Sequence, residues 1–212
     1  YLLNAQGTAN VAQAAAHAGA RLFAISTDYV FSGDQPGDRD EGDPTAPNTV
    51  YGATKLAGED AVRALCPDHV IARIAWLYGA GGPSFVHTMV RLAKEDPTRT
   101  LKVVDDQFGN PTSTDAVADA LTAFIARPDL RGTFHLTCEG VISWCGFTRE
   151  ILRLAGFPQV NVTPCTTEEF PRPAPRPNFS ALSKAKLAAN NLPSMPPWQD
   201  ALARFIAAEW PQ

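Results

Sequence analysis

The chain has 212 residues, of which 45% are apolar and 19% are charged, and its net charge is −4. This length suits one substantial core or two small lobes, and the composition is that of a soluble globular protein. The slightly acidic balance provides no basic surface for nucleic acid, and no apolar run is long enough to span a membrane.

The cysteines and histidines do not form a recognisable pattern. The four cysteines show no paired spacing and the four histidines are scattered, so neither a disulfide framework nor a metal site is predicted. Reduced thiols are typical of intracellular proteins, and we therefore expect a cytoplasmic protein. The sequence opens inside a helical pattern without a signal peptide, so we expect an N-terminal segment to precede it.

The first predicted element is a helix over residues 2–18. Leu3, Val11 and Ala15 recur there at helical spacing, which predicts that they face the core. Gly19 is well placed to end the helix, because glycine readily adopts the left-handed conformation of a C-terminal cap.

Strands and helices then alternate around one long loop. In chain order we predict a strand over 21–26, a loop over 32–49, a helix over 51–65 with Leu56, Val62 and Leu65 on one side, and a strand over 69–79. Such alternation favours a parallel sheet with helices on its faces, which is an α/β fold.

The second half continues this alternation. We predict helices over 85–95, 113–127, 143–156 and 198–210, strands over 100–107 and 132–138, and side-chain caps at Ser113 and Ser143. Residues 164–178 contain five prolines, which excludes a regular element and by itself suggests a linker.

Tyr51 and Lys55 are four residues apart at the start of a predicted helix, so their side chains share one face. A phenol has a pKa of about 10, and a neighbouring ammonium lowers it. Lowering it to about 7 requires roughly 4 kcal/mol, which Lys55 and a cationic cofactor ring could supply together. Tyr51 is then a candidate general acid. This short pattern also fits an ordinary surface pair.

A polar cluster follows the first strand. Ser26, Thr27, Asp28 and Tyr29 stand where the strand over 21–26 ends. Ligands of open parallel sheets bind beyond the carboxyl ends of the strands, so this cluster is placed to contact a bound molecule.

Three motifs, "NAQGTANVAQAA", "STDYVF" and "YGATKLAGE", resemble the extended short-chain dehydrogenase/reductase family. The motifs "ARIAWLYG", "VVDDQFGNPT" and "PRPNFSALSKAKL" narrow the resemblance to its reductases of dTDP-linked keto sugars. The resemblance extends over nearly the whole chain. It implies NADPH or NADH as cofactor and a nucleotide sugar as substrate.

The implied fold is the C-terminal part of a Rossmann-like doubly wound parallel sheet with a smaller α/β substrate-binding lobe. Residues 1–78 and about 112–137 would belong to the sheet domain, about 79–111 and 138–194 to the lobe, and 195–212 to a C-terminal helix. The resemblance also moves Arg176, Pro177, Ser180 and Leu182 from a linker into this lobe.

The family's Gly-rich dinucleotide motif is not found in this sequence. "GAGGPS" at Gly79 is the sole candidate, and it has serine where the third glycine should be and Pro83 inside it. The resemblance therefore implies that the N-terminal Gly-rich βαβ portion is lacking here.

The implied reaction is reduction of the 4-keto group of dTDP-4-dehydro-6-deoxy-L-mannose to dTDP-L-rhamnose. In the family's pattern, Thr27, Tyr51 and Lys55 are the catalytic residues. Tyr51 delivers the proton, Thr27 bonds the same oxygen, and Lys55 tunes Tyr51 and binds the nicotinamide ribose. Ser26 is expected beside the cofactor together with Tyr51 and Lys55.

The substrate side depends on Asp28, which would accept from a sugar hydroxyl, and on Trp76, which would pack on the sugar or close the pocket. Plain core packing is the alternative for Trp76. Dehydratases of the same superfamily carry an acid where this chain has Tyr29, so reduction is favoured over dehydration.

Two alternatives stay open at this point. An epimerase reuses the same Tyr and Lys, and the regulatory β-subunit of methionine adenosyltransferase resembles these reductases without catalysing their reaction. The intact set of Thr27, Tyr51 and Lys55 favours an enzyme. A homodimer is compatible with the resemblance.

Overall fold

The central sheet consists of three parallel strands, and it confirms the predicted α/β class. In the computed structural model, which describes residues 1–171 and 173–211, β1 (Leu22–Thr27), β2 (His69–Ile74) and β7 (Gly132–His135) lie in the order β1-β2-β7. Both pairings are parallel, so all three carboxyl ends reach the same edge of the sheet.

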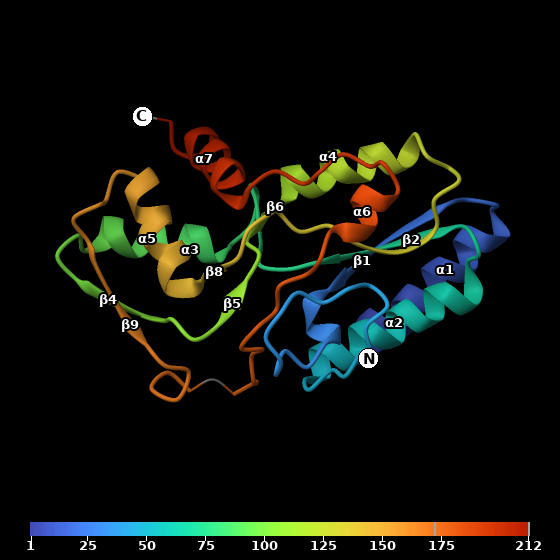
Figure 1. The fold of residues 1–212 in the computed structure, drawn as a ribbon, viewed down its shortest axis with the longest axis horizontal. Coiled ribbons are helices and arrows are strands. Elements are labelled where there is room, and N and C mark those ends of the chain that lie inside the picture. Colours follow the sequence, from blue (N-terminus) through green and yellow to red (C-terminus); the bar gives the residue numbers. More distant parts are fainter. Residues whose placement is uncertain (172, 212) are drawn as a thin grey trace.

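Helices cover both faces of this sheet (Figure 1). The helices α1 (Thr8–His17) and α2 (Val50–Leu65) lie side by side on one face, and α4 (Thr114–Ile125) lies on the other. The side chains of β2 alternate accordingly, since Ile71 packs in a small cluster with α1 and α2 while its neighbours enter the main core.

A second group of elements lies beside the sheet in Figure 1. Its centre is a parallel pair of strands packed on two helices: β4 (Thr100–Val104), β9 (Asn161–Cys165), α3 (Phe85–Glu95) and α5 (Trp144–Leu154). Four short strands connect it to the rest: β3 (Leu77–Tyr78), β5 (Phe108–Gly109), β6 (Thr112–Ser113) and β8 (Ile142–Ser143). The remaining helices are α6 (Ala185–Ala189), α7 (Trp198–Glu209), a π-helix over Leu2–Gly7 and the 3₁₀ turn η2 (Asp28–Val30).

The predicted caps are confirmed. The hydroxyl of Ser113 accepts a hydrogen bond from the amide of Ala116 at 3.2 Å, and that of Ser143 accepts one from Gly146 at 3.0 Å. Gly19 follows α1 with φ of 62°, the left-handed conformation expected of it. Thr49 caps α2 in the same way as the two serines, and so fixes where α2 begins, with Tyr51 in its first turn.

The predicted apolar face of the first helix is wrong for Leu3 and Val11, whereas Ala15 is partly buried against the cluster that contains Val62 and Ile71. Leu3 is 83% exposed and Val11 56% exposed, whereas Ala12 is fully buried. The reason is the close approach of α2 to the π-helix and the first residue of α1, in which a Cβ on Gly58 would lie 2.4 Å from the carbonyl oxygen of Asn4 and 3.4 Å from the hydroxyl of Thr8. Such an interface accepts alanine and excludes larger residues. Leu65, predicted on the same side of its helix as Leu56 and Val62, is 40% exposed.

Two further expectations need correction. The strand predicted over 69–79 is broken after Ile74, because Trp76 adopts a positive φ of 47° that no strand permits. Pro164, placed in an irregular segment by its sequence, lies within β9. The sheet of β4 and β9 has two strands, so both are edges, and an edge strand tolerates a residue without an amide hydrogen.

Gly52 allows the start of α2 to lie against η2, and this contact sets the position of Tyr51. A Cβ at residue 52 would lie 2.1 Å from the carbonyl oxygen of Tyr29. We expect Gly52→Ala to lower the free energy of unfolding by about 1–3 kcal/mol, because backbone must move to admit the methyl group. Urea unfolding measures this. The control is Gly42→Ala, where nothing lies within 4 Å of the new Cβ, and equal effects would contradict the close contact.

Candidate active site

One cavity collects every site residue that the sequence predicts. It has a volume of about 620 Å³ and opens at the carboxyl ends of β1 and β2. The predicted residues that line it are Ser26, Thr27, Asp28, Tyr51, Lys55 and Trp76. The strand ends supply four of them and α2 supplies the other two, as the pattern of elements predicted.

Tyr51 lies at the open side of the cavity, 49% exposed, with its ring edge-on to Tyr29 at 5.7 Å between centroids. Burial raises the pKa of Tyr51, while a hydrogen bond with Thr27 acts in the opposite direction. Lys55 therefore does not lower the pKa of Tyr51 by itself, and the lowering predicted for Lys55 together with a cofactor ring stays a prediction. The ammonium of Lys55 donates to the carbonyl oxygen of Ile25 at 2.6 Å instead.

Thr27 and Asp28 form a hydrogen-bonded pair at the base of the cavity. The Thr27 hydroxyl donates to one carboxylate oxygen of Asp28 at 2.9 Å and accepts from the amide of Tyr29 at 3.3 Å. Asp28 is 3% exposed, and its other oxygen has no hydrogen-bond partner in the part of the chain that the structure describes. Burial raises the pKa of Asp28 to about 6, and the hydrogen bond from Thr27 opposes this rise.

The raised pKa of Asp28 predicts a dependence of stability on pH. A carboxyl whose pKa rises on folding, here from 3.8 to about 6, destabilises the protein above pH 6 and stops doing so below its unfolded value. Two units correspond to about 3 kcal/mol. We therefore expect Asp28→Asn to stabilise the protein by up to about 3 kcal/mol at pH 8 and to have little effect near pH 4.

Urea unfolding of both proteins at several pH values measures this difference, with the exposed Asp34→Asn as the control. A loss of stability in Asp28→Asn at pH 8 would show that the buried carboxylate is held in its charged form.

Trp76 packs against the core and also lines the cavity, while its predicted contact with the sugar stays a prediction. Its ring stacks on Trp144 with 3.5 Å between centroids and 6° between planes, and it is half-buried. A Cβ on Gly109 would lie 2.6 Å from the indole, so Gly109 makes room for this stack.

Arg176 is the cavity residue whose position the sequence did not predict. It lines the main cavity and two adjoining ones of about 240 Å³ each, and the residues shared between them include Trp76, Phe85 and Trp144. The family motif around "PRPNFS" placed Arg176 in the lobe, but nothing in its spacing indicates that the segment returns to the strand ends.

The "GAGGPS" segment forms the turn between β3 and α3. Gly79 packs against Thr114, whose hydroxyl would lie 2.0 Å from an added Cβ, and Ser84 caps α3 by accepting from His87. The contact with Thr114 gives Gly79 a structural reason, since a larger residue would not fit there.

A parallel sheet whose strand ends carry Thr27 and Asp28, with Tyr51 and Lys55 on the following helix, defines an α/β protein of the short-chain dehydrogenase/reductase type. The model of the family "RmlD substrate binding domain" matches residues 1–210. The chain belongs to this family.

Relatives and solved structures agree with this assignment. The chain is 42% identical to the dTDP-4-dehydrorhamnose reductase of Streptomyces griseus over 211 residues, which cover 97% of this chain and 69% of the relative. A reductase structure from Bacillus anthracis, in complex with NADP, is 42% identical with a TM-score of 0.94, and covers 98% of this chain and 73% of that one. A reductase structure from Clostridium acetobutylicum is 46% identical with a TM-score of 0.92, and the match covers 97% of this chain and 72% of that one.

None of the helices in the described part of the chain is long and apolar enough to cross a membrane. The described residues also contain no group of three or more potential metal ligands.

Proposed function

We propose that this chain performs the NAD(P)H-dependent reduction of dTDP-4-dehydro-L-rhamnose to dTDP-L-rhamnose, the reaction for which its relatives are named. The observation that carries the proposal is the single cavity that brings Thr27, Tyr51 and Lys55 together at the strand ends. Relatives of about 40% identity over nearly the whole chain support it.

The cavity has unused hydrogen-bonding capacity that fits a nicotinamide nucleotide. An ammonium has three donors, and the structure gives Lys55 one acceptor, the carbonyl oxygen of Ile25. The others are available to ribose hydroxyls, and the buried hydroxyl of Ser26 lies in the same wall. When bound, the reduced cofactor supplies the hydride that reaches C4 of the sugar.

Tyr51 is the proton donor in this proposal. As negative charge develops on the C4 oxygen, the phenol gives its proton to that oxygen. The raised pKa of Tyr51 suits a group that must hold its proton until then. The Lys55 ammonium then stabilises the phenolate that remains.

Thr27 and Asp28 are proposed to act together. The proton of the Thr27 hydroxyl is directed at Asp28 in the structure, so it is not available to a substrate oxygen. A sugar hydroxyl that donates to Asp28 would satisfy that carboxylate and release the threonine proton for the C4 oxygen. Substrate binding would thereby complete the set of donors.

The remainder of the substrate is assigned to the second group of elements. Trp76 and Arg176 line both the 620 Å³ cavity and a smaller one, so they are proposed to contact the sugar and the nucleotide portion. The division into a sheet domain (1–78 and about 112–137) and a substrate-binding lobe (about 79–111 and 138–194) remains part of this proposal.

The test uses the natural full-length protein with NADPH or NADH and dTDP-4-dehydro-L-rhamnose. Oxidation of the cofactor together with dTDP-L-rhamnose in the NMR spectrum is the expected result. A new sugar isomer without net cofactor oxidation would indicate an epimerase. No turnover, with a partner enzyme that co-purifies, would indicate a regulatory subunit.

A further inference from the structure

A buried ion pair lies one helical turn behind Lys55. Glu59 is 3% exposed and Arg73 is 2% exposed. The guanidinium of Arg73 donates to both carboxylate oxygens of Glu59, from Nε to Oε1 at 2.9 Å and from Nη2 to Oε2 at 2.8 Å. Arg73 stands in the middle strand, in register with Ser26 of β1 and His135 of β7. The pair therefore lies beneath the wall that carries Lys55.

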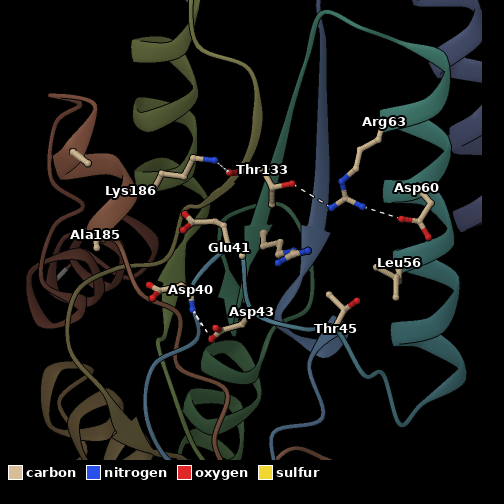
Figure 2. Close-up of a pocket in the computed structure, with 13 residues that line it drawn as sticks. Asp40, Glu41, Asp43, Thr45, Leu56, Asp60, Arg63, Thr133, Ala185 and Lys186 are labelled. Carbon is tan, nitrogen blue, oxygen red and sulfur yellow. Dashed lines mark hydrogen bonds and ion pairs between the residues drawn. The ribbon is translucent and has the colours of Figure 1, made fainter.

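Four side chains follow one another at intervals of four residues along α2: Tyr51, Lys55, Glu59 and Arg63. Residues at this spacing are neighbours on a helix surface. Arg63 donates to Oε2 of Glu59 at 2.6 Å, and it is about 12 Å further along the helix axis than Lys55. Figure 2 shows the guanidinium of Arg63 between Thr133 and Asp60, to which it also donates. Of these charges, Glu59 is therefore the nearest to Lys55 along the helix.

We propose that Glu59 is a positioning residue for the Tyr51–Lys55 pair, and that its carboxylate, fixed by Arg73, keeps the ammonium of Lys55 charged. This inference rests on the proposed function for the use that is made of that charge. Its test does not depend on turnover.

The surroundings of Lys55 explain why such a carboxylate is needed. Lys55 is half-buried, and burial lowers its pKa, while the charge of Glu59 raises it. The other groups around the same cavity are Asp28, Tyr29, Tyr51 and Arg176. Burial raises the pKa values of both tyrosines, so they favour their neutral forms. Burial also raises the pKa of Asp28 to about 6, so Asp28 is charged at the alkaline pH where a lysine titrates, but Glu59 is the carboxylate whose charge raises the pKa of Lys55. Glu59 is the opposite case, since Arg73 overcomes the effect of burial and its pKa is lowered.

Stability alone does not account for this pair. Burying two charges costs free energy that their attraction recovers only in part, and apolar residues of similar volume are often as stable or more so. Arg73 also leaves its Nη1 without a hydrogen-bond partner among the described residues. The charge of Glu59 acts on Lys55, and an apolar replacement of the Glu59–Arg73 pair could not provide that charge.

The experiment measures the titration of Lys55 in the whole chain. Each lysine is acetylated competitively over a range of pH, and the extent at Lys55 is read by mass spectrometry. We expect Glu59→Gln to lower the midpoint for Lys55 by about one pH unit, a usual effect for loss of a close opposite charge. Asp60→Asn is the matched control, because the adjacent carboxylate is exposed and pairs with Arg63.

Arg73→Met separates the electrostatic role from a structural one. Both substitutions break the same ion pair, so a merely structural role predicts that they move the Lys55 midpoint alike. The proposal predicts that Arg73→Met leaves the Lys55 midpoint unchanged or raises it, because Glu59 still pairs with Arg63 and is ionised at the alkaline pH where a lysine titrates. If Glu59→Gln does not fold, the Glu59→Gln/Arg73→Met double variant has no unpaired buried charge and must still show a lowered midpoint.

An unchanged midpoint in both Glu59 variants would overturn the proposal, as would equal downward shifts in Glu59→Gln and Arg73→Met. Because these readings come from the chain itself, a protein without reductase activity would refute the proposed function and leave the result for Glu59 intact.

Discussion

Tyr51→Phe is expected to lower the turnover of keto-sugar reduction at least about 10²-fold, with a modest change in substrate affinity. A positioned proton donor typically contributes about 10²- to 10⁴-fold, and the phenylalanine ring cannot donate. The ring itself keeps its edge-on contact with Tyr29, so the cavity retains its shape. Since the proton moves only in the transition state, kcat and kcat/KM should fall together.

Steady-state kinetics of the full-length protein measure this, and Tyr78→Phe is the matched control. Tyr78 is 2% exposed, packs on Phe147 and Phe205, and is not itself among the residues that line the cavity. Its hydroxyl has no hydrogen-bond partner among the described residues, so its removal should leave turnover within a few-fold. Near-normal turnover in Tyr51→Phe would remove Tyr51 from the role of acid.

The sequence predicted those parts of the fold that follow from local chemistry. Ser113 and Ser143 cap helices because a hydroxyl can accept from an amide two or three residues ahead, a relation that is visible in the sequence. The three parallel strands followed from the alternation of apolar runs with helices. The site was predictable for the same reason, because residues that end parallel strands meet at one edge.

What the sequence could not predict depends on contacts between distant segments. Leu3 and Val11 have the right spacing for a buried face, but the close approach permitted by Gly58 turned the alanine face inward. The break at Trp76 required knowledge of its stacking partner Trp144, which is 68 positions further on in the chain. Such pairings have no local signal.

The electrostatics of the site show the same limit. The spacing of Tyr51 and Lys55 predicts that they share a helix face, and they do line one cavity. The spacing does not reveal that the ammonium of Lys55 donates to the carbonyl oxygen of Ile25. Nor does it reveal that Arg73, which lies in a different strand, forms an ion pair with Glu59. The charge state of Lys55 thus depends on three segments of the chain.

The identity of the residue at position 29 predicts which reaction the cavity does not support. Dehydration of dTDP-glucose requires a base that removes the proton from C5 of the oxidised sugar. Tyr29 stands where the related dehydratases are expected to carry an acid for that step. Burial raises the pKa of Tyr29, and the charge of Asp28 raises it further. A phenol in this condition cannot accept a proton near neutral pH.

We therefore expect the full-length protein to reduce the 4-keto sugar and to convert dTDP-glucose at least about 10²-fold more slowly, the smallest contribution usual for a general base. The protein is incubated with dTDP-glucose and oxidised cofactor, and NMR is used to look for the 4-keto-6-deoxy product. Tyr29→Phe is the control, since it keeps the ring and removes the hydroxyl, and it should not change this ratio. Formation of the product at a rate comparable to reduction would mean that Tyr51 and Lys55 serve a dehydratase, and that its base is a residue other than Tyr29.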